Sequence, residues 1–424
     1  MPIIIHRHRL ALPRFASVTA IILTVLAGNM IGATTSRADT PAGIDWTQQT
    51  APATSNQWLA VTYGNGLFAA VAARASSNQV MTSPDGVTWT ASSVTGADDI
   101  YFRGITYGNG QFVAVGVSRF GLNRVMTSPD GIAWTLRTAA DQEWASVAYG
   151  NGKFVAVSRT NLGIGSVMTS VDGVSWASTA AAQDNNWNSV VYAGGQFAAV
   201  AESGTNRVMT SLDGINWTLR TAPGTSNWNS VTYGNGTYVA TAWGGTGTNR
   251  VMTSPDGVTW TAQSGFEAAE WGSVTFGDGL FIAVSNNASG DRVMTSPDGA
   301  TWTGRPAASA KQWVAVTYGG GTFVAVAQFA GVDAVMTSSA IVDPVLPMAE
   351  WTIIHQALPM PATNQCSDVE DENFAWGTGL TGGWTRGWES WVGSSNPEGP
   401  RGGWACVRTL VNTGGNQWLV NGST

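Results

Sequence analysis

The sequence that decides the fold lies near the start of the chain, where residues 58–71 read WLAVTYGNGLFAAV and residues 80–90 read VMTSPDGVTWT. Both phrases recur along the chain. The aromatic residue before the first turn returns every 41 to 44 residues, at Tyr63, Tyr107, Tyr149, Tyr192, Tyr233, Phe276 and Tyr318. The second phrase follows each time, beginning at Val80, Val125, Val167, Val208, Val251, Val293 and Val335. Seven repeats of this length match the four-stranded blades of a β-propeller.

Each repeat contains four short apolar runs rich in Val, Phe, Tyr, Trp and Thr, and none is long enough or suitably periodic for a helix. Dipeptides such as Asn65-Gly66 join the first two runs, and pairs such as Asp85-Gly86 join the last two. These dipeptides tolerate the positive φ that a tight hairpin turn requires. Each repeat is therefore predicted to form two hairpins in series, with the tight turns on one face of the ring and the variable loops on the other.

The seventh repeat lacks its fourth strand, because it breaks off after Ser338. Residues 44–47, Ile-Asp-Trp-Thr, read like residues 87–90 and stand just before the first repeat. An open ring would expose unpaired backbone groups at the edge of its last sheet. We therefore predict an all-β fold, a seven-bladed β-propeller over residues 39–342 that is closed by its own N-terminal strand.

The first 38 residues have the layout of a secretory signal. A basic stretch precedes an apolar run from Phe15 to Leu26, and small residues follow it up to Ala38. The apolar run is too short for a helix that spans a bilayer permanently. We expect cleavage after Ala38, no membrane insertion, and a secreted protein, with the periplasm as the alternative compartment.

Charge and residue usage exclude several classes of function. Cleavage after Ala38 removes four arginines and no acidic residue, which leaves a formal net charge of −11. An acidic surface repels phosphate backbones, so we expect no nucleic acid partner. His355 is the only histidine after residue 38, which excludes His-based metal sites and Ser-His-Asp triads within the propeller. Every Gly-x-Gly stretch belongs to a hairpin turn, and we predict neither a cofactor nor a bound metal.

Six copies of the pattern Ser-x-Asp-Gly-x-x-Trp stand at 83–89, 128–134, 170–176, 211–217, 254–260 and 296–302. They resemble the compact form of the Asp-box (BNR) repeat of sialidase-like propellers, and the resemblance covers residues 44–342. It implies boxes in the hairpin between the third and fourth strands, on the face away from the active site. It implies no activity, because function depends on the site and not on the fold. The residues themselves predict structural turns, since Ser and Asp side chains readily bond nearby backbone groups.

The variable face carries the predicted ligand-binding residues. The first strand of six repeats opens with a tryptophan, at Trp58, Trp144, Trp187, Trp228, Trp271 and Trp313. The third strand of four repeats opens with an arginine, at Arg124, Arg207, Arg250 and Arg292. Aromatic rings flanked by planar donors suit sugar rings or carboxylated ligands. The alternative is that the rings wedge adjacent blades apart and the arginine stems lie over them.

A sialidase-like glycoside hydrolase is the rival interpretation. The resemblance would require an arginine cluster, a Tyr nucleophile with a Glu partner and an Asp acid, and none of these can be assigned. Glu143 and Glu270 belong to the third and sixth repeats, too distant for glycosidase carboxylates that lie ~5–9.5 Å apart. Asp184 and Glu202, both in loops of the fourth repeat, remain the candidate catalytic residues.

The composition changes after a stiff linker at 343–349. Seven tryptophans among Gly-rich turns predict a small Trp-rich β domain over residues 350–424. Cys366 and Cys406 are the only cysteines, and export predicts one disulfide between them, with two buried free thiols as the alternative.

These patterns together predict a monomeric, secreted binding or adhesion protein rather than an enzyme. We expect the variable face to recognise a carbohydrate, another cell-envelope component or an extracellular protein. A sialidase-like glycoside hydrolase and a structural scaffold are the alternatives. Clustered carboxylates at the mouth of the central channel would favour the hydrolase, and their absence would favour binding.

Overall fold

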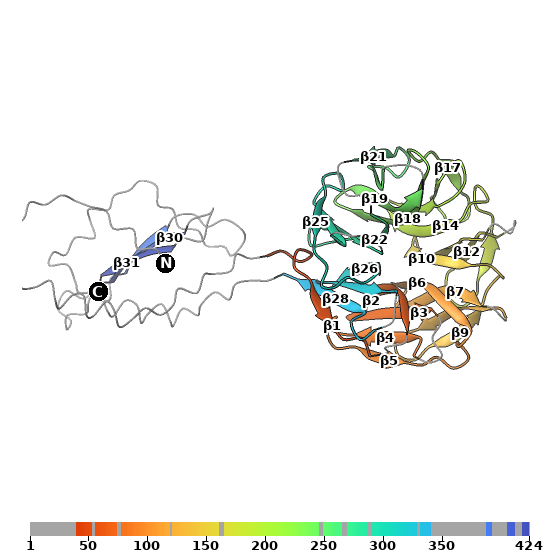
Figure 1. Cartoon of the computed structure of the whole chain (residues 1–424), viewed down its shortest axis with the longest axis horizontal. Helices are drawn as coiled ribbons and strands as arrows, with labels where there is room; N and C mark the ends of the chain where they lie inside the picture. The colour runs from red at the N-terminus through yellow and green to blue at the C-terminus, as the bar shows by residue number, and fades with distance from the viewer. Residues whose placement is uncertain are drawn as a thin grey trace, which may run out of the picture. The chain divides into compact units, whose positions relative to one another are not determined.

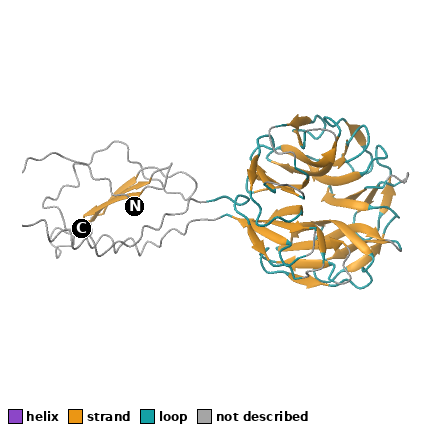
Figure 2. Ribbon diagram, in the orientation of Figure 1, coloured by secondary structure: helices purple, strands orange, loops and turns teal. Residues whose placement is uncertain are grey.

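The computed structural model describes residues 40–52, 56–73, 78–118, 121–160, 165–245, 249–264, 269–286, 291–328 and 331–340, and the backbone of residues 387–391, 405–411 and 418–423. Contacts divide the chain into two units, one formed by Thr40–Ile341 and the other by the two flanking segments. The described residues form strands, turns and loops (Figure 2). Among them, no helical segment could cross a bilayer.

Seven four-stranded antiparallel sheets make up the first unit, one for each repeat, as the repeats predict. Blade one consists of β2 (Gln57–Gly64), β3 (Leu67–Ala73), β4 (Val80–Ser83) and β5 (Thr90–Ser92). Blade two consists of β6 (Ile100–Gly108), β7 (Gln111–Ser118), β8 (Asn123–Ser128) and β9 (Thr135–Thr138). Blade three consists of β10 (Trp144–Gly150), β11 (Lys153–Ser158), β12 (Val167–Ser170) and β13 (Ala177–Thr179). Blade four consists of β14 (Trp187–Ala193), β15 (Gln196–Ala201), β16 (Val208–Ser211) and β17 (Thr218–Arg220). Blade five consists of β18 (Ser226–Gly234), β19 (Thr237–Gly245), β20 (Val251–Ser254) and β21 (Thr261–Gln263). Blade six consists of β22 (Trp271–Gly277), β23 (Leu280–Ser285), β24 (Val293–Ser296) and β25 (Thr303–Arg305). Blade seven is β26 (Trp313–Gly319), β27 (Thr322–Ala327), β28 (Val335–Ser339) and β1 (Thr47–Gln49).

The blades form a closed ring. The first strand of each blade lies toward the middle of the ring and the fourth strand toward its rim (Figure 1). First strands of neighbouring blades contact each other all the way round, and β26 of the last blade contacts β2 of the first. The fold is therefore the predicted seven-bladed propeller.

The N-terminal strand closes the ring, as predicted. β1 pairs with β28 through Thr47 opposite Thr337, and the strand starts at Thr47 rather than at Ile44. The backbone N–H of Gly43 donates to Ser338 Oγ at 2.7 Å, and Trp46 Nε1 donates to the Gly43 carbonyl at 3.1 Å. These are the bonds that Ser83, Gly86 and Trp89 make within one hairpin. The last turn of the ring is thus assembled from the two ends of the propeller.

Both tight turns of each blade lie on one face, as the turn chemistry predicts. Asn65 and Gly66 adopt φ of 51° and 75°, the values that a two-residue hairpin turn requires. The two kinds of turn also touch between blades, since Gln111 Nε2 donates to the Asp172 carbonyl at 2.7 Å. The loops that differ from blade to blade therefore lie on the opposite face.

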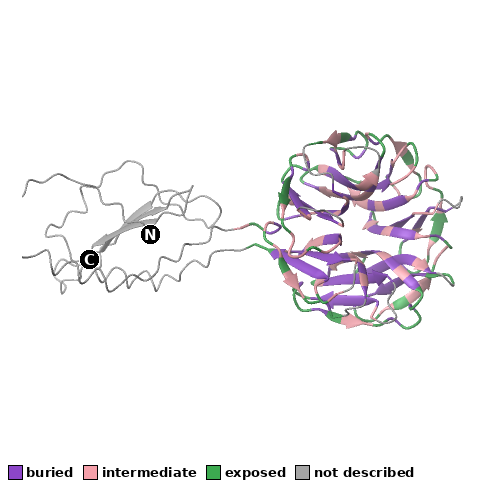
Figure 3. Ribbon diagram, viewed as in Figure 1, coloured by how far each residue is buried: buried purple, intermediate pink, exposed green. Residues whose placement is uncertain are grey.

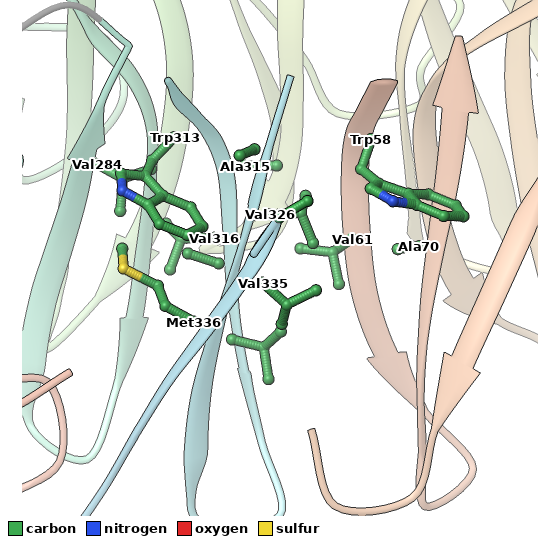
Figure 4. Close-up of a cluster of buried hydrophobic side chains, with 14 of the residues drawn as sticks. Trp58, Val61, Ala70, Val284, Trp313, Ala315, Val316, Val326, Val335 and Met336 are labelled. Carbon is green, nitrogen blue, oxygen red and sulfur yellow. The ribbon is translucent and has the colours of Figure 1, made fainter. Parts of the chain in front are cut away.

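The buried residues lie mainly in the strands of the propeller (Figure 3), and core clusters combine side chains from neighbouring blades. Trp58, Trp313, Val335 and Met336 belong to one buried cluster that joins the first and last blades (Figure 4). The methionine in the second position of the second phrase is buried in all seven blades, where it packs in the core.

The six Ser-x-Asp-Gly-x-x-Trp turns share one set of hydrogen bonds. In the first, Ser83 Oγ accepts from Gly86 N at 2.8 Å, and Asp85 Oδ1 accepts from Val87 N and Thr88 N, each at 2.8 Å. Trp89 Nε1 donates to the Gly86 carbonyl at 2.7 Å. These donors lower the pKa of every one of the six carboxyl groups. The turns are self-contained structures, as the residue types predict.

Acid should therefore weaken the propeller through these turns. The backbone N–H groups of Ser175 and Val174 lower the pKa of Asp172 to about 2, and Thr301 N–H and its neighbours do the same for Asp298. A carboxyl group whose pKa is lowered in the folded protein stabilises the fold at pH values above its ordinary pKa of 3.8. This stability is lost as the pH falls toward 2, because the group then becomes protonated. Between pH 4 and pH 2, the melting temperature of the double variant Asp172→Asn/Asp298→Asn should fall by roughly a third less than that of the parent protein. Thermal denaturation across that range measures the difference, with Asp184→Asn as the control.

The described part of the second unit is a three-stranded antiparallel sheet of β29 (Gly387–Trp391), β30 (Ala405–Val411) and β31 (Trp418–Ser423). Cys366, the linker at 343–349 and the secretory signal lie outside the described residues. The disulfide to Cys406 and the Trp-rich domain therefore stay predictions.

Candidate functional site

The six tryptophans predicted to bind ligand are core residues. Trp271 is 2% exposed and the other five, Trp58, Trp144, Trp187, Trp228 and Trp313, are fully buried. Trp144, Trp187 and Trp313 also donate their indole N–H to the carbonyl four residues earlier, each at 3.1 Å. A ring enclosed between blades offers no face to a ligand. This corrects the expectation of a tryptophan-lined site, and the alternative, that the rings wedge adjacent blades, describes all six.

Three of the four predicted arginines brace loops. Arg124 is buried, forms an ion pair with Asp141 and donates to the Gln142 carbonyl. Arg207 Nη1 donates to the carbonyls of Thr225 and Ser226 at 2.8 and 2.7 Å, and Arg292 Nη1 donates to the Lys311 carbonyl at 2.9 Å. Arg250 likewise has an interaction partner. Each of Arg124, Arg207 and Arg292 reaches the segment that leads into the next blade, so their first role is structural.

The two candidate catalytic residues have different surroundings. Asp184 is exposed. Glu202 accepts a bidentate pair of bonds from Arg159 at 3.0 and 2.9 Å, one bond from Asn186 Nδ2 at 3.0 Å and one from Asn188 Nδ2 at 3.3 Å. Burial alone would raise the pKa of Glu202, but the charge of Arg159 and these hydrogen bonds outweigh it and lower the pKa. Glu202 is therefore an ionised acceptor and not a proton donor.

The candidate site lies where the first two strands of each blade open onto the variable face. There the residue after the second strand bonds back to the residue before the buried tryptophan, as Arg159 N does to the Glu143 carbonyl at 2.9 Å and Glu202 N to the Asn186 carbonyl at 3.1 Å. The residue after the aromatic occupies a bulge in the first strand, between Phe102 and Gly104 in the second blade. These positions bring polar side chains to the central axis.

Contacts between blades that are not neighbours place this group at the axis. The guanidinium of Arg159, in blade three, lies 5.9 Å from the ring centroid of Trp243, in blade five. Arg103, in blade two, interacts electrostatically with Glu202, in blade four. In a ring of seven blades, such side chains meet only near the middle. We call Arg103, Glu143, Arg159, Asn186, Asn188, Glu202, Trp243 and Asn286 the channel cluster.

Several polar atoms of the channel cluster are buried and have no hydrogen-bond partner in the protein. They are two donors, Arg103 Nε and Trp243 Nε1, and two acceptors, Asn188 Oδ1 and Asn286 Oδ1. Buried polar groups are almost always paired in folded proteins, so each exception requires an explanation. Burial, and then the neighbouring charge of Arg159, lowers the pKa of Arg103. Each of these atoms has almost no exposed surface, so the protein itself encloses it.

Sequence reasoning named Glu202 but missed the rest of the channel cluster. The signal that identifies it is the residue directly after the one that pairs with the buried aromatic. This residue changes in every blade although the strand around it repeats: Ala73, Val117, Arg159, Glu202, Trp243, Asn286 and Gln328. No group of His, Cys, Asp and Glu in the part of the chain that the structure describes could hold a metal ion.

No protein-family model matches the chain, and no curated protein is similar to it in sequence. Many solved structures resemble the propeller. A streptogramin B lyase has a TM-score of 0.59 and 9% identity, over 71% of this chain and 100% of that one. Virginiamycin B lyase from Staphylococcus aureus has a TM-score of 0.58 and 11% identity, over 70% and 99%. YCF48 bound to D1 peptide has a TM-score of 0.53 and 13% identity, over 73% and 100%. Likenesses at this level of identity show the propeller fold alone.

Proposed function

We propose that this chain is an exported binding protein whose propeller recognises a carbohydrate or another cell-envelope ligand at the channel cluster. The observation that carries the proposal is the meeting of polar and aromatic side chains from several blades in this cluster. A ligand rich in hydroxyl groups both donates and accepts hydrogen bonds, and so suits a surface that offers both donors and acceptors. The layout of the first 38 residues supports export.

The surroundings of the channel cluster support the same ligand class. The equivalent positions of the other blades carry Tyr101, Asn227, Asn229, Gln312 and Gln328, all at least partly accessible. Amide side chains both donate and accept, and aromatic rings offer a flat apolar face, which together suit a sugar ring. The hydrolase interpretation has no such support, because Glu202 is committed to Arg159 and two asparagines.

We also propose that the six repeated turns are Asp boxes of the sialidase-like propellers. Their shared set of bonds between Ser, Asp, Gly and Trp supports this assignment.

A glycan array on the purified protein, followed by calorimetric titration of the best ligand, tests the binding function. Asn286→Ala removes one partly accessible amide of the channel cluster and should weaken binding about tenfold, because a tenfold change corresponds to roughly one hydrogen bond. The control is Ile132→Ser, since Ile132 is 63% exposed in a turn on the opposite face. Binding to no glycan, or equal losses in both variants, would contradict the proposal and favour a structural scaffold.

A further inference from the structure

Two neighbouring Ser-x-Asp-Gly-x-x-Trp turns each expose two large apolar side chains. Val171 and Val174, in the third blade, are 67% and 39% exposed, and Leu212 and Ile215, in the fourth, are 72% and 44% exposed. We call these four residues the apolar turn patch. We propose that the patch binds a basic, apolar segment of another protein. It lies on the face opposite to the channel cluster, so this proposal does not depend on carbohydrate binding.

The residue between Ser and Asp distinguishes these two turns from the other four. There it is an exposed proline, at Pro84, Pro129, Pro255 and Pro297. All six turns nonetheless share the bond from the glycine N–H to the serine Oγ at 2.8 Å. Proline favours turns because its φ is fixed. The turn itself therefore does not require Val171 or Leu212, and neighbouring exposed apolar side chains are typical of an interaction surface.

The two turns belong to adjacent blades that interlock. Asn151 Nδ2, in the third blade, donates to the Leu212 carbonyl at 3.3 Å. A Cβ on Gly214 would lie 2.6 Å from Cγ2 of Val155 in β11. The turn of the fourth blade therefore sits directly on the third blade. Packed sheets lie on the order of 10 Å apart, and seven extended residues span about 23 Å, so one short segment reaches both turns.

Charge selects among the partners that an apolar surface could bind. The tight turns of this face carry the six repeated aspartates and Asp278, and the only basic residue that adjoins one of them in sequence is Lys153. Within the patch, Asp172 and Asp213 each accept two backbone N–H bonds at 2.8 Å, which favour the ionised carboxylate. A second copy would bring this acidic face against itself, and an anionic lipid surface would also be repelled. A basic segment is attracted instead.

Three heptapeptides test the proposal on the full chain. The probe is Leu-Leu-Lys-Lys-Leu-Leu-Lys, in which both sides of an extended strand carry leucine and lysine. Its two counterparts replace every lysine by glutamate or every leucine by serine. We expect the probe to bind at least about tenfold tighter than either counterpart, because only the probe complements both the apolar side chains and the charge. Fluorescence anisotropy of the labelled peptides measures the affinities.

The double variant Val171→Pro/Leu212→Pro separates the patch from the fold. Proline occupies this position in the other four turns, so the variant should melt at or above the temperature of the parent. It removes the two most exposed side chains of the patch and should weaken binding of the probe at least about tenfold. Val171→Ser/Leu212→Ser should weaken it to a similar extent. The control Leu122→Ser removes a side chain that is 57% exposed between β7 and β8, on the opposite face, and should leave the affinity unchanged.

The outcomes are distinct from those of the carbohydrate tests. Equal binding of the probe and either counterpart, no binding of the probe, or an unchanged affinity in both double variants overturns the proposal. Self-association of the parent that both double variants abolish in sedimentation equilibrium would assign the patch to a second copy of the chain, and would overturn it as well. Absence of glycan binding contradicts the proposed function and leaves this proposal standing.

Discussion

A chain that lacks residues 39–49 should melt on the order of 10 °C below the full-length protein. The deletion removes β1 from the seventh blade and leaves the backbone groups of β28 unpaired along one edge. It also removes Ala42, which is fully buried, and the bond from Gly43 N to Ser338 Oγ. The core between the last and first blades then opens to water. Differential scanning calorimetry measures the change.

A circular permutant provides the matched control. Moving residues 41–49 to follow Ala340 keeps the same strand and makes the seventh blade continuous in sequence. We expect this permutant to melt at or above the temperature of the parent, because the closing strand is then tethered beside its partner. If the truncated chain melts at the parent temperature, β1 does not close the ring in solution.

Gly150→Ala should destabilise the propeller by about 2 kcal/mol, or roughly 4 °C, through overpacking between blades. A Cβ at this glycine would lie 1.9 Å from Cγ of Tyr192, the atom that joins the ring to its side chain. The ring cannot move away without displacing the next blade. The same contact recurs between Gly64 and Tyr107, and between Gly319 and Tyr63 across the closure.

The fourth blade offers a natural control, because it carries Ala193 where other blades have this glycine. Ala193→Gly should change stability by at most about 1 kcal/mol, the ordinary entropic effect of a glycine in a strand. Urea denaturation of both variants compares them directly. Similar losses in Gly150→Ala and Ala193→Gly would show that the tyrosine contact does not limit the size of this residue.

The sequence predicts the architecture well because the repeated residues are the ones that geometry restricts. Asn65-Gly66 and Asp85-Gly86 each specify a turn, and the spacing between such pairs leaves room only for short strands. Even the closure is predictable, since Trp46 stands in the position that the seventh repeat lacks. What repeats in this chain is the framework.

The site could not be predicted in the same way, because a bulge interrupts the alternation of side chains between the two faces of a strand. The alternating sequence pattern therefore does not give the direction of a side chain at a bulge. The bulge that follows Trp187 leaves that ring between blades, whereas the next residue, Asn188, reaches the channel cluster. Without the bulge, the tryptophan is the natural choice for a ligand. Arg103 and Trp243 have no residue of the same type at the equivalent positions of the other blades, so the repeated pattern does not mark them.

The composite last turn also determines how the ring would respond to a mechanical load. Thr47, where β1 begins, lies opposite Thr337, close to the end of β28 at Ser339. Tension between the two ends of the propeller would therefore peel β1 away one hydrogen bond at a time, starting beside Ser338. Tension between a ligand on the variable face and the chain after Ser339 would instead load β28, which is bonded to a strand on each side. The propeller should therefore resist a force applied between a bound ligand and its C-terminal end. It should open at lower force when the force is applied between its N-terminal and C-terminal ends.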